Sequence, residues 1–291
     1  MDWVNAVVQG VLLGGLYALL ATGLSLVFGV MRLVNLAHGD FSTLAAFLAL
    51  IVVSATGVNP FLAIPVVVPV MMIFGYLVQR LLLNRSIENG PLSPLLVTFG
   101  LSVVLQNLML DVFSADSRGL DAGPIENASI HLTNDIAVGV FPLLTFGVAF
   151  LVLGGLGSAL ARTQLGRALR ATSDDSISAR LVGIDHRHLY AVALAIAFAT
   201  VAVAGIFLGI RTTFGPSDGP SRLIAAFEAV IIGGLGSLWG TLVGGIVLGV
   251  AQALGNQVSP AFQLLAGHLV FLAILVFRPR GLFAPASARQ A

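Results

Sequence analysis

Three polar side chains interrupt a long apolar stretch near the N-terminus. Asn35, His38 and Asp40 lie close together in the segment that separates two hydrophobic stretches. An amide, an imidazole and a carboxylate can bind polar solutes or carry protons, and ionisable groups at membrane depth are candidates for function. Two interpretations fit this segment. It is either a structural turn between two helices, or a broken helix whose polar groups line a pathway.

Two further acidic residues lie at the edges of apolar segments. Asp111 falls near the end of one segment and Glu228 at the start of another. Each carboxylate either faces a pathway or sits at the membrane interface, where water can reach it. We include Glu228 with Asn35, His38 and Asp40 as the candidate translocation-pathway residues.

The remaining chemistry-bearing residues form no catalytic pattern. His186 and His188 are two residues apart, a spacing that suits shared ligation on a helix poorly, and the other three histidines are isolated. The chain has no cysteine, so the sequence predicts neither a metal site nor a nucleophile–base pair. Every positive charge is an arginine, which excludes the Gly-x-x-x-x-Gly-Lys loop that binds nucleotide phosphates. We therefore expect a non-catalytic protein with no cofactor of its own. The net charge of +1 gives no reason to expect a nucleic-acid partner.

The elements that position these residues are membrane-spanning helices. Hydrophobic residues make up 57% of the chain and charged residues only 9%, against about 25% charged in soluble proteins. No charged side chain lies between Asp40 and Arg80 or between Glu228 and Arg278. One span needs about 20 apolar residues, and these runs lack the alternation of barrel strands. The sequence predicts an all-α, polytopic membrane helix bundle that forms a single domain over residues 1–291.

We expect eight or nine hydrophobic segments. The segment 224–235 is short enough to be a half-helix, so re-entrant or broken helices are expected there and at 31–40. The segments cover residues 5–30, 41–56, 61–79, 92–113, 136–161, 189–210, 224–235, 238–256 and 262–277.

Glycines repeat every four residues near the start of the eighth segment. Gly236, Gly240 and Gly244 would share one helix face, where the backbone of another helix can approach closely. The spacing predicts helix packing, and the cluster that begins at Gly233 also permits a helix break.

Charge distribution predicts how the chain is oriented. Arginines concentrate in the link 162–188 and the tail 278–291, whereas acidic residues dominate the loop 114–135. Because arginine-rich loops stay in the cytoplasm, we place the link and the tail inside and the acidic loop outside. One predicted span, 136–161, separates the two, which is consistent with this orientation. The N-terminus is then outside.

The arginine-rich link also has the pattern of a short capped helix. Ser173 can cap a helix whose first turn contains Asp174 and Asp175, because side-chain oxygens and negative charges suit a helix N-terminus. Gly183 followed by Ile184 is typical of a glycine C-cap with its hydrophobic contact. The helix is either an ordinary interfacial element or a docking element for a cytoplasmic partner.

Several motifs together resemble the LivH-type permease subunits of branched-chain amino-acid ABC importers. They occur in order and cover nearly the whole chain. The matching stretches are GGLYALLATGLSLVFG at 14–29, NLAHGDF at 35–41, GRALRA at 166–171, ARLVGI at 179–184 and FEAVIIGGLGSLWG at 227–240.

The resemblance implies a multi-pass permease of the bacterial inner membrane that translocates branched-chain or related amino acids. The implied partners are a homologous LivM-type permease, two cytoplasmic ATP-binding subunits that hold ATP and Mg, and a periplasmic substrate-binding protein. The resemblance also assigns coupling to the ATPases to seven residues of the link. These are Arg167, Arg170, Asp174, Asp175, Ala179, Gly183 and Ile184.

Two alternatives stay open. Related permeases serve urea, short amides or aromatic acids, so the substrate is not fixed by the resemblance. A self-sufficient secondary transporter or channel would instead need a coupling-ion site within this chain, for which Asp40, Asp111 and Glu228 are the candidates.

Overall fold

The computed structural model describes residues 2–90, 92–131 and 137–283. Asp135 of the predicted acidic loop and Arg289 of the predicted tail lie outside these ranges.

The chain is a bundle of membrane-spanning helices. In the described residues, seven helical stretches are long and apolar enough to cross a membrane. They are α1 (Asp2–Met31), α2 (His38–Thr56), the continuous stretch of η1 (Pro60–Ala63), α3 (Ile64–Val78), η2 (Gln79–Leu83) and α4 (Asn84–Ile87), α5 (Leu92–Phe113), α6 (Val140–Arg162), α9 (His186–Arg211) and α11 (Leu238–Val258). Two shorter helices complete the set, α10 (Gly219–Gly233) and α12 (Phe262–Phe277). Each predicted hydrophobic segment therefore contains a helix, and the all-α membrane fold is confirmed.

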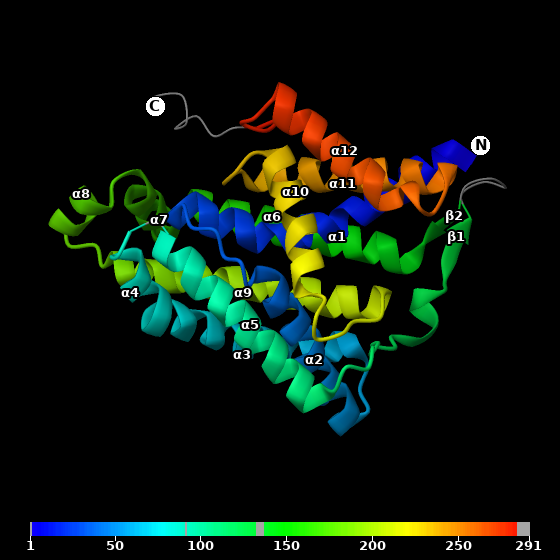
Figure 1. Ribbon diagram of the computed structural model, residues 1–291, viewed down its shortest axis with the longest axis horizontal. Helices are drawn as coiled ribbons and strands as arrows, with labels where there is room; N and C mark the ends of the chain where they lie inside the picture. The colour runs from blue at the N-terminus through cyan, green and yellow to red at the C-terminus, as the bar shows by residue number, and fades with distance from the viewer. Residues whose placement is uncertain (1, 91, 132–136, 284–291) are drawn as a thin grey trace.

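Short elements mark the two ends of the bundle. At one end lie α7 (Gln164–Asp174) and α8 (Ser176–Leu181), which we call the arginine-rich end. At the other lie η3 (Gly123–Glu126) and the two-stranded antiparallel sheet of β1 (Ser129–His131) and β2 (Ala137–Gly139), which we call the acidic-loop end (Figure 1). The two predicted polar regions thus lie at opposite ends of the bundle.

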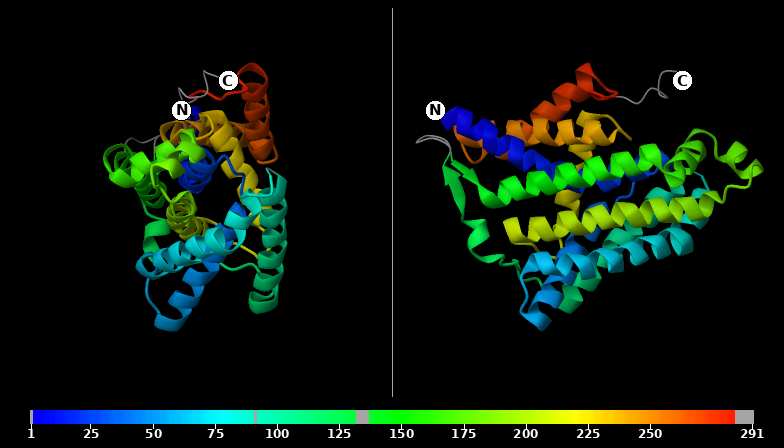
Figure 2. Two further views of the ribbon diagram at one scale, coloured as in Figure 1. Left: turned by 90° about the vertical axis from the view of Figure 1, so that its left-hand side faces the viewer. Right: turned by 180° about the vertical axis from the view of Figure 1, so that it is seen from behind.

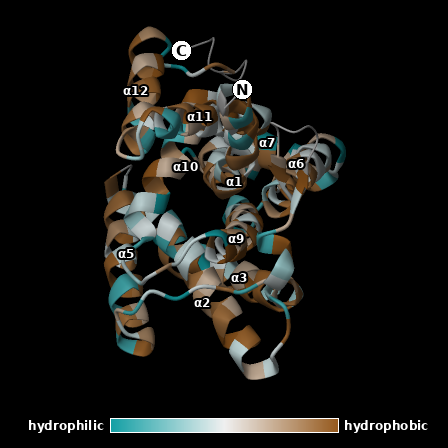
Figure 3. Cartoon of the chain, turned by 90° about the vertical axis from the view of Figure 1, so that its right-hand side faces the viewer, coloured by the Kyte–Doolittle hydropathy of each residue, from teal (hydrophilic) through white to brown (hydrophobic). Residues whose placement is uncertain are grey.

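The helices form two groups that pack together through α1 and α9 and are bridged by α10. Figure 1 and the two views of Figure 2 show α1, α6, α11 and α12 on one side and α2, α3, α5 and α9 on the other. The short helix α10 crosses between the groups at a steep angle, and it packs against both α11 and α2. The helices α1 and α9 form the centre of the bundle. The apolar part of each is 83% and 72% buried, respectively, against 22% for α5 and for α6. Figure 3 shows how strongly apolar residues dominate the helices.

Two helices begin inside the bundle because the chain turns back into it. After α1 ends at Met31, residues 32–37 return toward the middle of the same helix, where His38 contacts the Leu20 carbonyl. After α9 ends, residues 212–218 return in the same way, and α10 begins at Gly219 beside Asp40. The predicted break at 31–40 is therefore present. The second break precedes Gly219, so α10 starts earlier than the predicted segment 224–235.

The glycine repeat does not lie on a single helix face. Gly240 and Gly244 do contact α10, since an added Cβ would lie 2.3 Å from the Gly233 carbonyl oxygen and 2.0 Å from that of Ala229, respectively. Gly236 instead lies in the turn before α11 with φ +80° and packs against Gly29 of α1. Placing Gly236 on that face was wrong, because the helix begins only after Ser237 caps it.

Candidate functional site

The N-termini of α2 and α10 meet inside the bundle at what we call the α2–α10 junction, residues 32–40 and 212–222. Their backbones touch: a Cβ added to Gly39 would lie 1.8 Å from the Gly219 carbonyl oxygen. A Cβ added to Gly219 would lie 1.8 Å from Asp40 Oδ1. Only glycine fits at both positions, which explains how two helix ends can approach so closely.

Asp40 is buried where the two helix ends meet. Asp40 is only 1% exposed. Ser102 Oγ of α5 donates a hydrogen bond to Asp40 Oδ2 at 2.5 Å. Gln106 Nε2 in turn donates to Ser102 Oγ at 3.0 Å. Oδ1 has no hydrogen-bond partner within the described ranges and lies at the first residue of α10. The positive end of a helix dipole favours a carboxylate in that place.

Asn35 and His38 hold the return segment in place. His38 Nε2 lies 2.9 Å from the Leu20 carbonyl oxygen, and because a carbonyl only accepts, this ring nitrogen carries the proton. Asn35 Oδ1 accepts from the Ala37 amide at 3.1 Å. Both residues are 1% exposed. Asn35, His38 and Asp40 are thus all buried at the junction, and each bonds to a different group.

The second return segment, residues 212–218, also shapes the junction, although no sequence pattern indicated it. Asp218 Oδ2 accepts from the Gly215 amide at 2.8 Å, and the Phe214 backbone pairs with Arg118 of the acidic loop. Arg222 is only 8% exposed, and its guanidinium lies 6.0 Å from the Phe214 ring centroid. In the sequence this segment has the pattern of an ordinary turn. No local pattern indicates how deeply a segment lies within the bundle.

Glu228 lies apart from this cluster. It is 3% exposed on α10, and its carboxylate forms a hydrogen bond with His268 Nδ1 of α12. The His268 side chain is 49% exposed. It is a polar group on a helix whose other exposed residues are mostly apolar. The sequence suggested an isolated histidine, since the partners are far apart along the chain.

The link at the arginine-rich end contains two helices rather than one. Thr163 caps α7 by accepting from the Gly166 amide at 3.2 Å. The predicted Ser173 cap was wrong, because Ser173 is helical within α7 and its hydroxyl donates to the Gly29 carbonyl at 2.7 Å. Asp175 has extended φ and ψ and caps α8, accepting from the amides of Ile177 at 2.9 Å and Ser178 at 3.1 Å.

Hydrogen bonds from this cap also stabilise the charge of Asp175. The Ser178 hydroxyl and then the backbone amides of Ser178 and Ile177 hold the pKa of Asp175 below its ordinary value. Asp174 ends α7 on the exposed side of the same corner.

The C-terminus of α8 has the glycine cap that the sequence predicts. Gly183 has φ +86°, and its amide donates to the Arg180 carbonyl at 3.0 Å. The Ile184 amide donates to the Ala179 carbonyl at 3.1 Å, which completes a Schellman motif. Ala179 is 4% exposed and Ile184 packs against the core, so this end of α8 is anchored to the bundle.

Arg167 and Arg170 support the corner between α6 and α7. Arg170 Nη1 donates to the Leu160 carbonyl at 2.5 Å, and Arg167 Nη1 donates to the Arg162 carbonyl at 3.4 Å. Among the predicted coupling residues, the structure therefore gathers Asp175, Ala179, Gly183 and Ile184 around α8 and leaves both arginines on α7.

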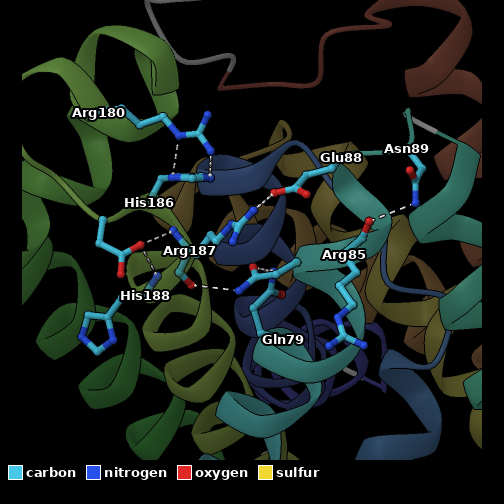
Figure 4. Close-up of polar contacts among 10 residues, drawn as sticks. Gln79, Arg85, Glu88, Asn89, Arg180, His186, Arg187 and His188 are labelled. Atoms are coloured by element: carbon cyan, nitrogen blue, oxygen red, sulfur yellow. Dashed lines mark hydrogen bonds and ion pairs between the residues drawn. The ribbon is translucent and has the colours of Figure 1, made fainter.

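Three large apolar side chains project from the anchored helix. Ile177, Leu181 and Val182 are 71%, 84% and 77% exposed. Figure 4 shows the polar contacts beside them: Arg180 Nε donates to His186 Nδ1 at 3.0 Å, and Arg187 forms an ion pair with Glu88. The first contact joins α8 to the start of α9, and the second joins α9 to the end of α4.

This arrangement defines a class of protein. Irregular backbone inside a membrane bundle is tolerated where protein covers it or where it lines a cavity, and broken helices of this kind are typical of transport proteins. A rigidly held helix with exposed apolar residues at one end adds a surface for another protein. The chain is a membrane transport protein by this geometry.

Comparison with known proteins identifies the family. A family profile described as the permease component of branched-chain amino acid transport systems matches residues 6–278, so the chain belongs to this family. It is 29% identical to the high-affinity branched-chain amino acid transport system permease protein BraD of Pseudomonas aeruginosa, over 96% of this chain and 95% of that protein. It is 27% identical to LivH of Escherichia coli, over 94% of this chain and 93% of that protein. A more distant match is LivM of Escherichia coli, at 26% identity over 92% of this chain and 67% of that protein.

Proposed function

We propose that this chain is the permease subunit of an ATP-binding-cassette importer that carries branched-chain or related amino acids across the bacterial inner membrane. Family membership supports the transport class. The observation that carries the proposal further is the exposed apolar surface of α8, formed by Ile177, Leu181 and Val182. We name these three residues the coupling surface.

The coupling surface has the chemistry of a docking site for a cytoplasmic protein. Removing apolar area from water gains about 25 cal/mol per Å², from which the costs of association are subtracted. These residues lie among charged side chains that keep the link out of the lipid. The arginines of the link place it in the cytoplasm by the positive-inside rule. An ATP-binding subunit, which would hold ATP and Mg itself, is the partner that importers of this class require there.

Movement would be transmitted through the anchored end of α8. The Schellman motif and the Arg187–Glu88 ion pair join the link to α9 and α4. Closure of the two ATPases would move α8 as a rigid body and, through these contacts, tilt the helix groups on either side of α10. The permease itself performs no chemistry in this scheme.

A second permease of LivM type would cover the face of α5, α10 and α12, which Figure 1 turns toward the viewer. Asn107 and Asp111 of α5 are exposed on this chain, and His268 of α12 is half exposed beside Glu228. Charged groups facing lipid are costly, so protein or a water-filled path beside a partner fits this face better. Among the predicted pathway residues, Glu228 therefore fits the path itself. Asn35, His38 and Asp40 fit a role in positioning the α2–α10 junction behind it.

The test is to make the coupling surface polar. In Ile177→Asp with Leu181→Asp, we expect a folded permease that no longer co-purifies with the ATP-binding subunits and no longer supports ATP-driven leucine uptake in liposomes. Ile130→Asp is the matched control, because Ile130 is 50% exposed at the acidic-loop end. Uptake that survives the double change would refute docking at α8. Gradient-driven uptake by this chain alone would favour a secondary transporter instead.

A further inference from the structure

A cavity of about 420 Å³ opens at the acidic-loop end, away from the α2–α10 junction and the coupling surface. Its wall is shared by α1, α6, α9, α11, α12 and the loop that contains η3. Ligand sites for small molecules usually measure about 300 to 1,000 Å³. The volume suits a small amino acid together with several waters, each of which takes about 30 Å³ in the liquid.

The wall of the cavity combines two opposite charges with amide groups. Arg211 ends α9, and Glu126 ends η3, and both line the cavity. Asn127, Asn256 and Gln263 line it as well. Glu126 Oε1 accepts from the Ala122 amide, which fixes the carboxylate while its second oxygen is left for another donor. In the described part of the chain, no carboxylate forms an ion pair with Arg211.

Apolar residues complete the wall. Leu13 of α1, Phe141 of α6 and Ile210 of α9 line the same cavity, with Ala253 of α11. Phe141 and Ile210 are 4% and 6% exposed, so they belong to the packed wall and do not project into water. A site that offers a cation, an anion and an apolar surface matches one class of small molecule.

We propose that this cavity binds a zwitterionic aliphatic α-amino acid. The Arg211 guanidinium holds the carboxylate, Glu126 holds the ammonium group, and the apolar wall contacts the side chain. The inference rests on the proposed function, which places the acidic-loop end outside the cell, and it adds a site where substrate is held after delivery. Arg211 acts as a fork that fits a planar carboxylate, so the site discriminates against solutes that lack either charge.

The absence of cysteine from this chain allows a direct test. Single cysteines are introduced at Ala253 and at Gln263, which line the cavity from different helices. The assembled importer in liposomes is treated with a membrane-impermeant maleimide, and labelling of this chain is followed by mass spectrometry. We expect leucine to slow labelling at both positions, whereas leucinamide and 4-methylpentanoate, each lacking one charge, protect poorly.

Charge variants identify the groups that hold the ligand. Because a hydrogen bond to a charged group contributes about a factor of 10 to affinity, Arg211→Gln and Glu126→Gln should each raise the leucine concentration for half-protection about 10-fold. Arg118→Gln is the matched control, since Arg118 pairs with Asp116 at the same end but does not line the cavity. Ser129→Cys, exposed on β1, should be labelled at the same rate with and without leucine.

The outcomes separate this site from the proposed function. ATP-driven uptake is measured in the same liposomes with the substrate-binding protein present. Uptake without any protection by leucine would overturn the site and leave the importer function standing. Equal protection by leucinamide, or protection unchanged in both charge variants, would also overturn it. Labelling blocked only by the docked binding protein would make the cavity a protein contact, which contradicts the proposal.

Discussion

The α2–α10 junction and the α7–α8 link distribute polar and apolar side chains in opposite ways. Asn35 and Asp40 at the junction are 1% exposed although they are polar. Leu181 and Val182 at the link are 84% and 77% exposed although they are apolar. The junction lies among apolar helices, where an unsatisfied backbone group is costly. The link extends from the bundle on the arginine-rich side, and the ends of its helices are satisfied by their own caps.

The difference separates residues that hold the fold from residues that contact a partner. At the junction, polar side chains bond to the surrounding helices, as His38 does with the Leu20 carbonyl in the middle of α1 and as Asp40 does with Ser102 of α5. At the link, the backbone is satisfied by its own caps, so the exposed apolar side chains contribute little to this chain alone. Changes at the junction should therefore unfold the bundle, and changes at the link should impair coupling without unfolding it.

Gly39→Ala tests the junction most severely. The new methyl group would lie 1.8 Å from the Gly219 carbonyl oxygen, a backbone atom that cannot move alone. We expect a loss of about 3 kcal/mol or more from overpacking, seen as poor yield and a lower unfolding temperature in detergent. Gly100→Ala in α5 is the control, because nothing lies within 4 Å of its added Cβ. Equal stability of the two variants would mean that the helix ends are not in contact.

Ser102→Ala removes a single bond from the same junction. Its hydroxyl donates to Asp40 Oδ2, and without it a buried carboxylate oxygen loses its donor. We expect a loss of about 2 kcal/mol in unfolding free energy, measured by thermal or denaturant unfolding of the purified protein. Ser54→Ala, whose exposed hydroxyl bonds to the Leu50 carbonyl, should change stability by less than about 0.5 kcal/mol. A Ser54 effect as large as that at Ser102 would contradict the distinction between buried and exposed bonds.

The sequence predicted where the helices and caps of these regions lie, but not how deeply each region lies within the bundle. Hydrophobic runs located the membrane-spanning helices, and Gly183 with Ile184 located the C-cap of α8, because both signals are local. Ser173 was predicted as the cap, with Asp174 and Asp175 in the first turn, because its hydroxyl suits that position; only the chain path shows that α7 continues through Ser173 and that Asp175 caps α8.

Long-range pairings explain the rest of the difference. Glu228 and His268, or Asp40 and Ser102, meet only because α10, α12 and α5 pack in a particular way. Gly39 and Gly219 likewise meet only because the two return segments enter the bundle to the same depth. Sequence periodicity does not predict contacts between residues that are far apart in the chain. The sequence therefore indicated single polar residues as candidates but not their partners.

Gly183→Ala tests the link at a smaller scale. Gly183 has φ +86° and nothing lies within 4 Å of an added Cβ, so the strain is conformational only. We expect a local loss of about 1 kcal/mol that frays α8 and weakens binding of the ATP-binding subunits several-fold. The unfolding temperature of the bundle should stay unchanged, as it should in the control Gly147→Ala of α6, whose added Cβ also meets nothing. A fall in that temperature would show that the link supports the fold after all.

Asp175→Ala should give the smallest effect, confined to the first turn of α8. Loss of the cap should speed hydrogen exchange of the Ile177 and Ser178 amides about fivefold, whereas Asp174→Ala, which removes an exposed carboxylate beside the cap, should not.

The pH dependence of this turn follows from the direction of the Asp175 shift. Because its hydrogen bonds lower the pKa of Asp175 from an ordinary value of 3.8, the charged cap is fully formed above that value. Its contribution is lost only as the pH falls through the lowered pKa in the folded protein. Exchange at Ile177, corrected for the intrinsic rate, should therefore be constant between about pH 5 and pH 7. A change within that range would mean that a group other than the Asp175 carboxylate controls the start of α8, and the coupling surface would then depend on pH where the cell operates.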